Sequence, residues 1–343
     1  MLVNKHKACC LPYLIIVISV MLLCGCELTS DTDKKVKNQP MKIRVGLAMQ
    51  PTSALLIIAA DKGYFKEQGL DVQIKKYPSG KRALYDGLLT GEVDVVTLNE
   101  TPFALAAFEH AELRAISGIY VDDNTNSIVA RRDFSIQLPA DLNGKKIATQ
   151  QASAVHYFMH QFLVENDIDF DQIDISFYKA EQLVDKLIKG EIDAFSMREP
   201  YVSQAREVLK EKVVVFEERG IYTQVGFLVG NESYLNKNSI IVKKFLKALL
   251  KAEGYVRDNR NESARLISGY IGSAYDGFSV SFSQAEVRLR FDQLYINISE
   301  DIARWAVKKE LVKGKTEIPN FLNNISAGFL KDVSPDSVSI IVN

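Results

Sequence analysis

The chain has 343 residues, with 42 Lys and Arg against 43 Asp and Glu and a formal net charge of −1. This length exceeds what one compact core usually holds, so we expect two lobes or domains. Because neither sign of charge forms a long block, the composition argues against nucleic acid or an acidic polymer as a partner.

Residues 1–25 have the pattern of an export signal, with a short basic head and an apolar run at 11–23 that is too short for a comfortable membrane span. The run ends in Leu-Cys-Gly-Cys, which resembles a bacterial lipobox. This predicts cleavage before Cys26 and a lipid on that cysteine, which would anchor the protein at the bacterial cell envelope, in the periplasm or on the outer face of the cytoplasmic membrane. An uncleaved signal anchor is the alternative.

All four cysteines lie in this first segment, so the folded part is expected to contain no disulfide, thiol nucleophile or thiolate metal site. Residues 26–41 are polar and lack a hydrophobic period, which indicates a flexible tether.

An internal repeat organises the rest of the chain. The frame Ala-x-Gln-x-x-Ser-Ala begins at Ala48 and again at Ala148, each time between a strand-like and a helical run. Further on, Gly91–Phe103 aligns with Gly190–Tyr201, with Thr101 as the only insertion. Two matches in the same order at nearly the same offset predict a duplicated lobe.

Each copy is expected to alternate strands and helices, which predicts an α/β lobe with a mainly parallel sheet. The predicted strands are 43–47, 72–77 and 93–98 in the first copy and 146–149, 173–178 and 192–197 in the second. A strand at 224–229 and an almost wholly helical tail follow, and the pattern at 283–286 is typical of a capping box that opens a helix.

The predicted first lobe comprises residues 42–130 and 226–343, and the second comprises residues 131–225. The chain would leave the first lobe near Arg131 and return near Gly226. Two such connections form a hinge, and a cleft between the lobes could close over a ligand.

The repeated motifs fall in loops after the strands, where parallel α/β sheets bind ligands. Gln50 and Gln150 lie at strand tips, where an amide can both donate and accept hydrogen bonds. Ser53 and Ser153 lie at helix starts, where either contact with an oxyanion or plain helix capping is expected.

A second pair of loops carries charged side chains. If the lobes face each other, Glu100 and Glu199 arrive from opposite sides and favour a ligand with amino or other donor groups, while Arg198 favours an anionic part. Together they indicate a zwitterion or a heterocycle with an exocyclic amine. The alternative is that Arg198 pairs with a neighbouring acid and each Glu caps its own helix. The candidate ligand-binding residues are Gln50, Ser53, Ser79, Gly80, Asn99, Glu100, Thr101, Gln150, Ser153, Arg198, Glu199 and Tyr201.

No catalytic residue, cofactor or metal site is predicted. His156 and His160 have i, i+4 spacing, but no adjacent carboxylate completes a metalloprotease motif, so a structural role is favoured. The sequence contains no GxSxG, P-loop or GxGxxG motif.

The stretch Ala60–Val72 resembles the signature of nitrate/sulfonate/taurine-type and thiamine-pyrimidine-precursor-type solute-binding proteins of ABC transporters. Ser79-Gly80, Gly91–Asp94 and Glu199–Tyr201 continue the pattern, and the likeness covers roughly residues 42–260. The resemblance implies a two-lobed type II periplasmic-binding-protein fold with two hinge crossings and a helical C-terminal tail. It also implies a monomeric binding protein, not an enzyme, that delivers a small polar solute to a membrane permease with a cytoplasmic ATPase.

Two alternatives stay open. A sensory binding lipoprotein would use the same lobe chemistry. Related eukaryotic proteins are pyrimidine synthases that use a cysteine-rich segment and consume their own histidine, and the absence of cysteine after residue 26 speaks against that enzymatic function.

Overall fold

The structure is a computed structural model that describes residues 39–340. The predicted export signal, the lipidation site Cys26 and nearly all of the predicted tether lie outside the described residues. From Met41 onward the chain forms one compact unit. Within the described part, none of the helices combines the length and the apolar character that crossing a membrane requires.

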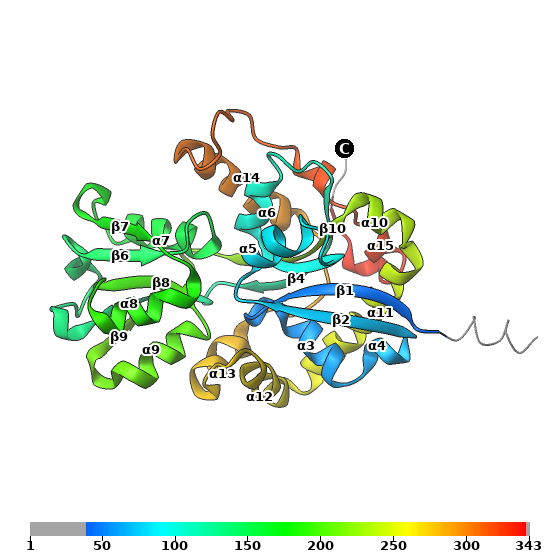
Figure 1. Cartoon of the computed structure of the whole chain (residues 1–343), viewed down its shortest axis with the longest axis horizontal. Helices are drawn as coiled ribbons and strands as arrows, with labels where there is room; N and C mark the ends of the chain where they lie inside the picture. Colours follow the sequence, from blue (N-terminus) through cyan, green and yellow to red (C-terminus); the bar gives the residue numbers. More distant parts are fainter. Residues whose placement is uncertain (1–38, 341–343) are drawn as a thin grey trace, which may run out of the picture. The chain divides into compact units, whose positions relative to one another are not determined.

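The first sheet has five strands in the order β2-β1-β3-β10-β4. Strands β1, β2, β4 and β10 of this sheet are labelled in Figure 1. Strand β1 (Met41–Ala48) pairs in parallel with β2 (Leu70–Tyr77) and with β3 (Val95–Asn99). Strand β10 (Gln224–Asn231) lies between β3 and β4 (Leu113–Asp122) and is antiparallel to both. Every residue of β3 is buried, as expected for a central strand covered on both faces.

The second sheet repeats this plan in the order β7-β6-β8-β5-β9. Strand β6 (Lys146–Thr149) pairs in parallel with β7 (Asp174–Phe177) and β8 (Ala194–Arg198). Strand β5 (Asn126–Arg131) is antiparallel to β8 and to β9 (Val213–Phe216). The predicted duplication therefore appears as one strand order used twice. In each sheet one strand is antiparallel to its neighbours, β10 in the first sheet and β5 in the second. Each is the first strand that the chain forms after it crosses from the other sheet.

The chain passes between the sheets at residues 123–125 and 217–223. The first crossing comes several residues before the predicted Arg131, because the strand ending at Arg131 already pairs with β8 of the second sheet. The second crossing ends before Gly226, which lies inside β10.

A helical segment follows each of the central strands at its carboxyl end. After the strands of the first sheet these segments are η1 (Pro51–Ser53) with α3 (Ala54–Asp61) and α4 (Tyr64–Glu67), α5 (Gly80–Arg82) with the π-helical η2 (Ala83–Leu88), and α6 (Glu100–Ala106). In the second sheet's half they are η3 (Arg132–Phe134), η4 (Pro139–Leu142), α7 (Ala154–Glu165), η5 (Phe170–Gln172), η6 (Ala180–Gln182), α8 (Leu183–Lys189), α9 (Tyr201–Leu209) and η7 (Lys210–Lys212).

The tail is helical, as predicted. Its elements are α10 (Glu232–Lys237), α11 (Ser239–Asp258), α12 (Arg260–Ile271), α13 (Tyr275–Gln284), α14 (Gln293–Lys308), η8 (Phe321–Asn324), α15 (Gly328–Lys331) and η9 (Pro335–Ser337). The prediction that a helix opens at 283–286 is wrong, because α13 ends there. The backbone of Glu286 instead exchanges hydrogen bonds with Val121 of the edge strand β4.

The largest hydrophobic core joins the first sheet to the tail. Helix α11 buries Val242, Phe245 and Leu249 and packs against α3, and α14 packs against α6. Two smaller clusters cover the second sheet. The tail therefore packs with the first sheet, and α7 packs with the second.

Candidate ligand-binding site

Polar side chains from the strand ends of both sheets meet at one place. Gln50, Asn99 and Arg198 are all at least 97% buried there, at 2%, 1% and 3% exposure. The Gln50 amide nitrogen donates to the Asn99 side-chain oxygen, and Arg198 Nε donates to Gln50 Oε1 at 3.1 Å. Arg198 Nη1 donates to Asn126 Oδ1 at 3.3 Å. The two sheets thus contribute to one buried polar network.

Arg198 is a buried cation that donates hydrogen bonds to neutral amides, and no carboxylate among residues 39–340 forms an ion pair with it. Burial lowers the pKa of the Arg198 guanidinium, and the charge of Glu100 acts in the opposite direction through space. A buried charge is costly unless it is paired and hydrogen-bonded. The network therefore favours an anionic group beside Arg198.

Three buried amide atoms of the same region have no hydrogen-bond partner within the described part of the chain. Two are donors, Asn99 Nδ2 and Gln224 Nε2, and one is an acceptor, Gln150 Oε1. The other ends of these amides are fixed, since Asn126 donates to Gln224 Oε1 at 3.0 Å and Gln150 donates to Ser79 Oγ at 3.1 Å. Because buried polar groups are normally satisfied, these atoms are suited to bind a ligand.

The carboxylate of Glu100 is engaged by other groups of the chain. Its carboxylate accepts hydrogen bonds from the Tyr222 hydroxyl, from Val225 N at 2.8 Å and from Thr101 Oγ1 at 3.1 Å. Burial raises the pKa of Glu100, while these hydrogen bonds work in the opposite direction. Both Glu100 and Thr101 are thus occupied by internal contacts, in contrast to the ligand contact that the sequence suggested.

The two serines of the repeated frame also serve the protein itself. Ser53 Oγ donates to Ala48 O at 2.6 Å and lies 2.7 Å from Thr97 Oγ1. Ser153 Oγ donates to Gln150 O at 2.5 Å. Neither side chain caps its helix, and both hydroxyls instead hold the strand-end loops in shape.

Ser79 and Gly80 bring a third loop to the site. Ser79 caps the short helix α5 and also accepts the hydrogen bond from Gln150 of the second lobe. A side chain on Gly80 would place its Cβ 2.7 Å from Leu98 Cα, so the glycine lets this loop approach β3. Beside it, Lys81 Nζ donates to Gln151 O at 2.6 Å, a second polar contact between the lobes.

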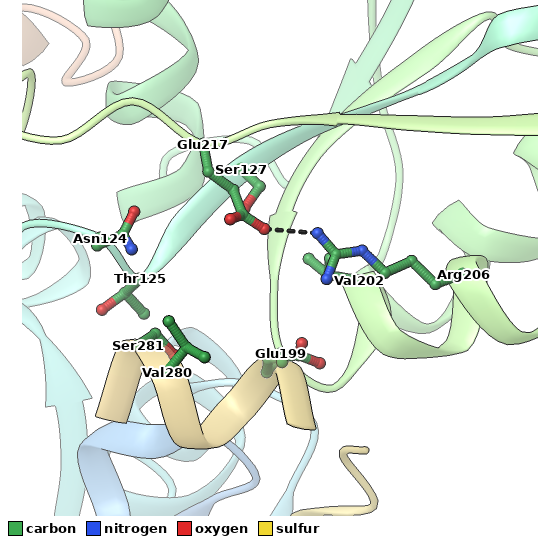
Figure 2. Close-up of a pocket in the computed structure, with 10 residues that line it drawn as sticks. Asn124, Thr125, Ser127, Glu199, Val202, Arg206, Glu217, Val280 and Ser281 are labelled. Carbon is green, nitrogen blue, oxygen red and sulfur yellow. Dashed lines mark hydrogen bonds and ion pairs between the residues drawn. The ribbon is translucent and has the colours of Figure 1, made fainter. Parts of the chain in front are cut away.

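Glu199 points away from this network. Its carboxylate accepts from Ser203 N at 3.2 Å and from Ser203 Oγ at 2.8 Å. It lines a separate cavity of about 160 Å³, where Arg206 and Glu217 form an ion pair at 2.7 Å (Figure 2). The predicted pair of opposing carboxylates in one cleft is therefore not formed.

Two larger cavities flank the central network. One, of about 410 Å³, has the side chains of Met49, Tyr77 and Tyr201 on its wall. The other, of about 550 Å³, is lined by Lys81 and Tyr178 among others. Burial raises the pKa of Tyr201 to about 12, so its phenol is neutral at ordinary pH. The aromatic Tyr77 and Tyr178 were not predicted, although both stand at strand ends, where the repeat already pointed.

Residues 39–340 contain no group of three or more His, Cys, Asp or Glu that could hold a metal ion. His156 and His160 lie on α7, where their rings pack against Trp305 at centroid distances of 5.1 and 6.2 Å.

Two mixed sheets with the same strand order, joined by two crossings, are the architecture of type II periplasmic solute-binding proteins, the class of the fold found here. Residues 50–263 match the family model described as NMT1/THI5 like, and the chain belongs to that family.

Similar proteins support the same class. The chain is 26% identical over 220 residues to the taurine-binding periplasmic protein of Escherichia coli (strain K12), an alignment that covers 63% of this chain and 67% of that protein. The alkanesulfonate-binding protein SsuA of Xanthomonas axonopodis pv. citri, solved bound to MOPS, aligns with a TM-score of 0.69 at 17% identity, over 88% of this chain and 99% of that one. The periplasmic nitrate-binding protein NrtA of Synechocystis PCC 6803 aligns with a TM-score of 0.68 at 11% identity, over 86% and 89%.

Proposed function

We propose that this protein is the solute-binding component of an ABC importer and that it captures a small solute carrying an oxyanion, such as a sulfonate, taurine or nitrate. The two lobes would close over the solute by rotation at the crossings 123–125 and 217–223. The closed protein would then deliver the solute to a membrane permease with a cytoplasmic ATPase, as a monomer and without catalysing a reaction. A lipid on Cys26 would hold it at the cell envelope.

The observation that carries this proposal is the buried Arg198, which has no acidic partner among residues 39–340. Its nearest polar neighbours are amides, and the unpartnered Asn99 Nδ2 and Gln224 Nε2 add two further donors nearby. Donors that converge on one point in a dry site favour negative charge, because water no longer competes for the hydrogen bonds. A sulfonate, carboxylate or nitrate supplies several acceptor oxygens for such a set.

The unpartnered acceptor of this region indicates which group the other end of the solute would carry. Gln150 Oε1 could accept a hydrogen bond from an amino group, and the cavity beside Tyr77 and Tyr201 could hold an apolar part. The NMT1/THI5-like family and the taurine, alkanesulfonate and nitrate proteins above support a binding function for this arrangement.

The test is thermal unfolding of the purified protein with taurine, methanesulfonate, nitrate and an aminopyrimidine, followed by calorimetry on those that shift the midpoint. A ligand at 100 times its dissociation constant adds about 2.7 kcal/mol, which raises the unfolding temperature by a few degrees. Dimethyl sulfone is the matched control, since it has the shape of methanesulfonate without its charge. We expect one or more anions to bind and the sulfone not to bind. Binding of the aminopyrimidine alone, or equal binding of the sulfone, would show that the oxyanion proposal is wrong.

A further inference from the structure

A second group of contacts joins the lobes away from the ligand-binding network. Trp305 of α14 lies against three rings of α7, with centroid distances of 5.1 Å to His156, 5.0 Å to Tyr157 and 6.2 Å to His160. Helix α14 packs against α6 beside the first sheet, whereas α7 packs against β5, β6 and β8 of the second. A rotation at the two crossings therefore changes this contact.

Trp305 is buried at this contact, whereas the three rings of α7 are half-buried, and His156 has a backbone partner on its own side, since Ala152 N donates to His156 Nδ1 at 3.3 Å. Trp305 is 7% exposed, and its Nε1 has no hydrogen-bond partner in the described residues. His160 Nδ1 is buried and also has no partner within residues 39–340. Aromatic packing, not directional hydrogen bonding, holds the two helices together, and such packing is favourable only while the rings are shielded from water.

The surroundings of the two histidines are basic. Burial, then His160, Lys81 of α5 and Lys309, which follows α14, lower the pKa of His156. Burial, then Lys309 and Lys308, lower the pKa of His160, while Gln161 acts to raise it. Asp301 of α14 acts on Tyr157, and no acidic residue is among the groups that shift the two histidines. Protonation of either ring in the closed arrangement would add a third positive charge to a half-buried site.

We propose that Trp305 and α7 form a closure contact that holds only while His156 and His160 are neutral, so that acidification opens the lobes. Tyr157 connects this contact to the start of α6, next to Asn99, because its ring packs on Tyr222 at 5.3 Å and Tyr222 donates to Glu100. Trp305 is thus a positioning residue for closure. It touches no residue of the Arg198 network in the aromatic contacts that the structure shows.

The change in the ratio of closed to open protein with pH follows from the difference in histidine pKa between the two forms. Burial, then the nearby cations, lowers the pKa of His156 to about 4. If opening hydrates the ring and restores a pKa near 6.5, the closed form is favoured fully above about pH 6.5 and loses its advantage as the pH falls towards 4. Between about pH 7.5 and about pH 5 the ratio of closed to open protein then falls about thirtyfold.

The experiment uses the ligand-free protein and therefore does not depend on which solute binds. Small-angle X-ray scattering at about pH 7.5 and about pH 5 measures the radius of gyration, and NMR titration of the ring protons gives the pKa of each histidine. The emission of Trp305, the only tryptophan of the chain, reports its hydration. We expect a larger radius and red-shifted emission at the lower pH, and a His156 pKa between about 4 and about 6.5, set by the balance of closed and open protein.

The variants separate closure from folding. The double substitution H156Q/H160Q should abolish the change of radius with pH, while His110→Gln, on a partly exposed histidine beside Glu112, should leave it intact. Trp305→Ala should move the His156 pKa towards 6.5, and Trp305→Phe should restore part of the shift. A His156 pKa near 6.5 in the unaltered protein, or a radius that does not change with pH, would overturn the proposal. Far-UV circular dichroism on each sample excludes unfolding as the cause of a larger radius.

Discussion

The loops that follow β3 and β8 align in sequence, and the two strands hold the same place in their sheets. The acidic residues of the two loops nevertheless make different contacts. After β3, Asn99 faces the ligand network and Glu100 turns inward to Tyr222. After β8, Arg198 takes the position facing the network, and Glu199 turns outward to Ser203 and the cavity at the crossings. One duplicated loop thus supplies a neutral amide and the other supplies the cation.

The cause of this difference lies in where each helix begins. Glu100 is the first residue of α6, whereas α9 begins at Tyr201, two residues after Glu199. The inserted Thr101 keeps Glu100 inside its helix and donates to it. The two copies therefore have the same backbone position at the strand ends. The glutamate side chains point in different directions because the following helices begin at different residues. A binding protein can gain an asymmetric site from a symmetric plan in this way.

The largest expected effect is the loss of ligand affinity caused by Arg198→Ala. Removing a buried hydrogen-bonded charge that meets an opposite charge costs about 2–5 kcal/mol, which is a loss of affinity of about 30-fold to several thousandfold for the anion that binds best in the screen. Calorimetry measures it. The ligand-free variant should unfold at an unchanged or higher denaturant concentration, because it no longer buries a cation without an acidic partner.

Arg206→Ala is the matched control for this substitution. Arg206 lies in the same lobe but pairs with Glu217 at a half-exposed position, where an ion pair contributes little. Its removal should change affinity by less than about twofold. Equal losses in the two variants would mean that general positive charge, not the buried guanidinium, attracts the solute.

A smaller effect, on stability, is expected for Tyr222→Phe. The substitution removes the hydroxyl that donates to the buried Glu100, and hydrogen bonds to charged groups contribute about 1.5–3 kcal/mol. Burial raises the pKa of Glu100 and the Tyr222 bond opposes that rise, so the bond stabilises the charged carboxylate. The loss of unfolding free energy should therefore be greater at about pH 8 than at about pH 5, where more of Glu100 is protonated.

Urea unfolding at the two pH values measures this difference. Tyr85→Phe, on a ring that is 39% exposed, is the control and should lie within about 0.5 kcal/mol of the unaltered protein at both. A loss for Tyr222→Phe that is the same at both pH values would indicate that Glu100 is protonated throughout, and the first loop would then hold a neutral acid.

The sequence predicted the repeat, the central strands and the position of Arg198, because each depends on local pattern. It could not predict the direction of Glu100, whose partners Tyr222 and Val225 lie more than 120 residues away and belong to no recurring motif. Asn126 and Gln224 were missed for a related reason. Each is the first residue of a strand that enters from a crossing, and the first crossing was expected at Arg131, five residues too late to place Asn126 at the site.

The smallest expected effect is that of Glu199→Ala on ligand affinity. It distinguishes the sequence-based prediction, in which both glutamates face the cleft, from the structure, in which they do not. The sequence alone predicts that Glu199→Ala weakens ligand binding, since Glu199 aligns with Glu100 beside the same cleft. The structure predicts a change in affinity of less than about twofold, because the carboxylate contacts Ser203 and not the Arg198 network. The unfolding free energy should fall by about 1 kcal/mol, from the two lost hydrogen bonds at the start of α9.

Ser203→Ala and the double variant complete a thermodynamic cycle for Glu199. If the two residues act only on each other, the double variant should be no less stable than the worse single variant, and all three should bind the solute equally. A loss of affinity in Glu199→Ala that Ser203→Ala does not reproduce would show that Glu199 turns towards the solute once the solute is bound. In that case the second loop would supply both charges of the site, and the opposing carboxylate inferred from the repeat would exist only in the liganded protein.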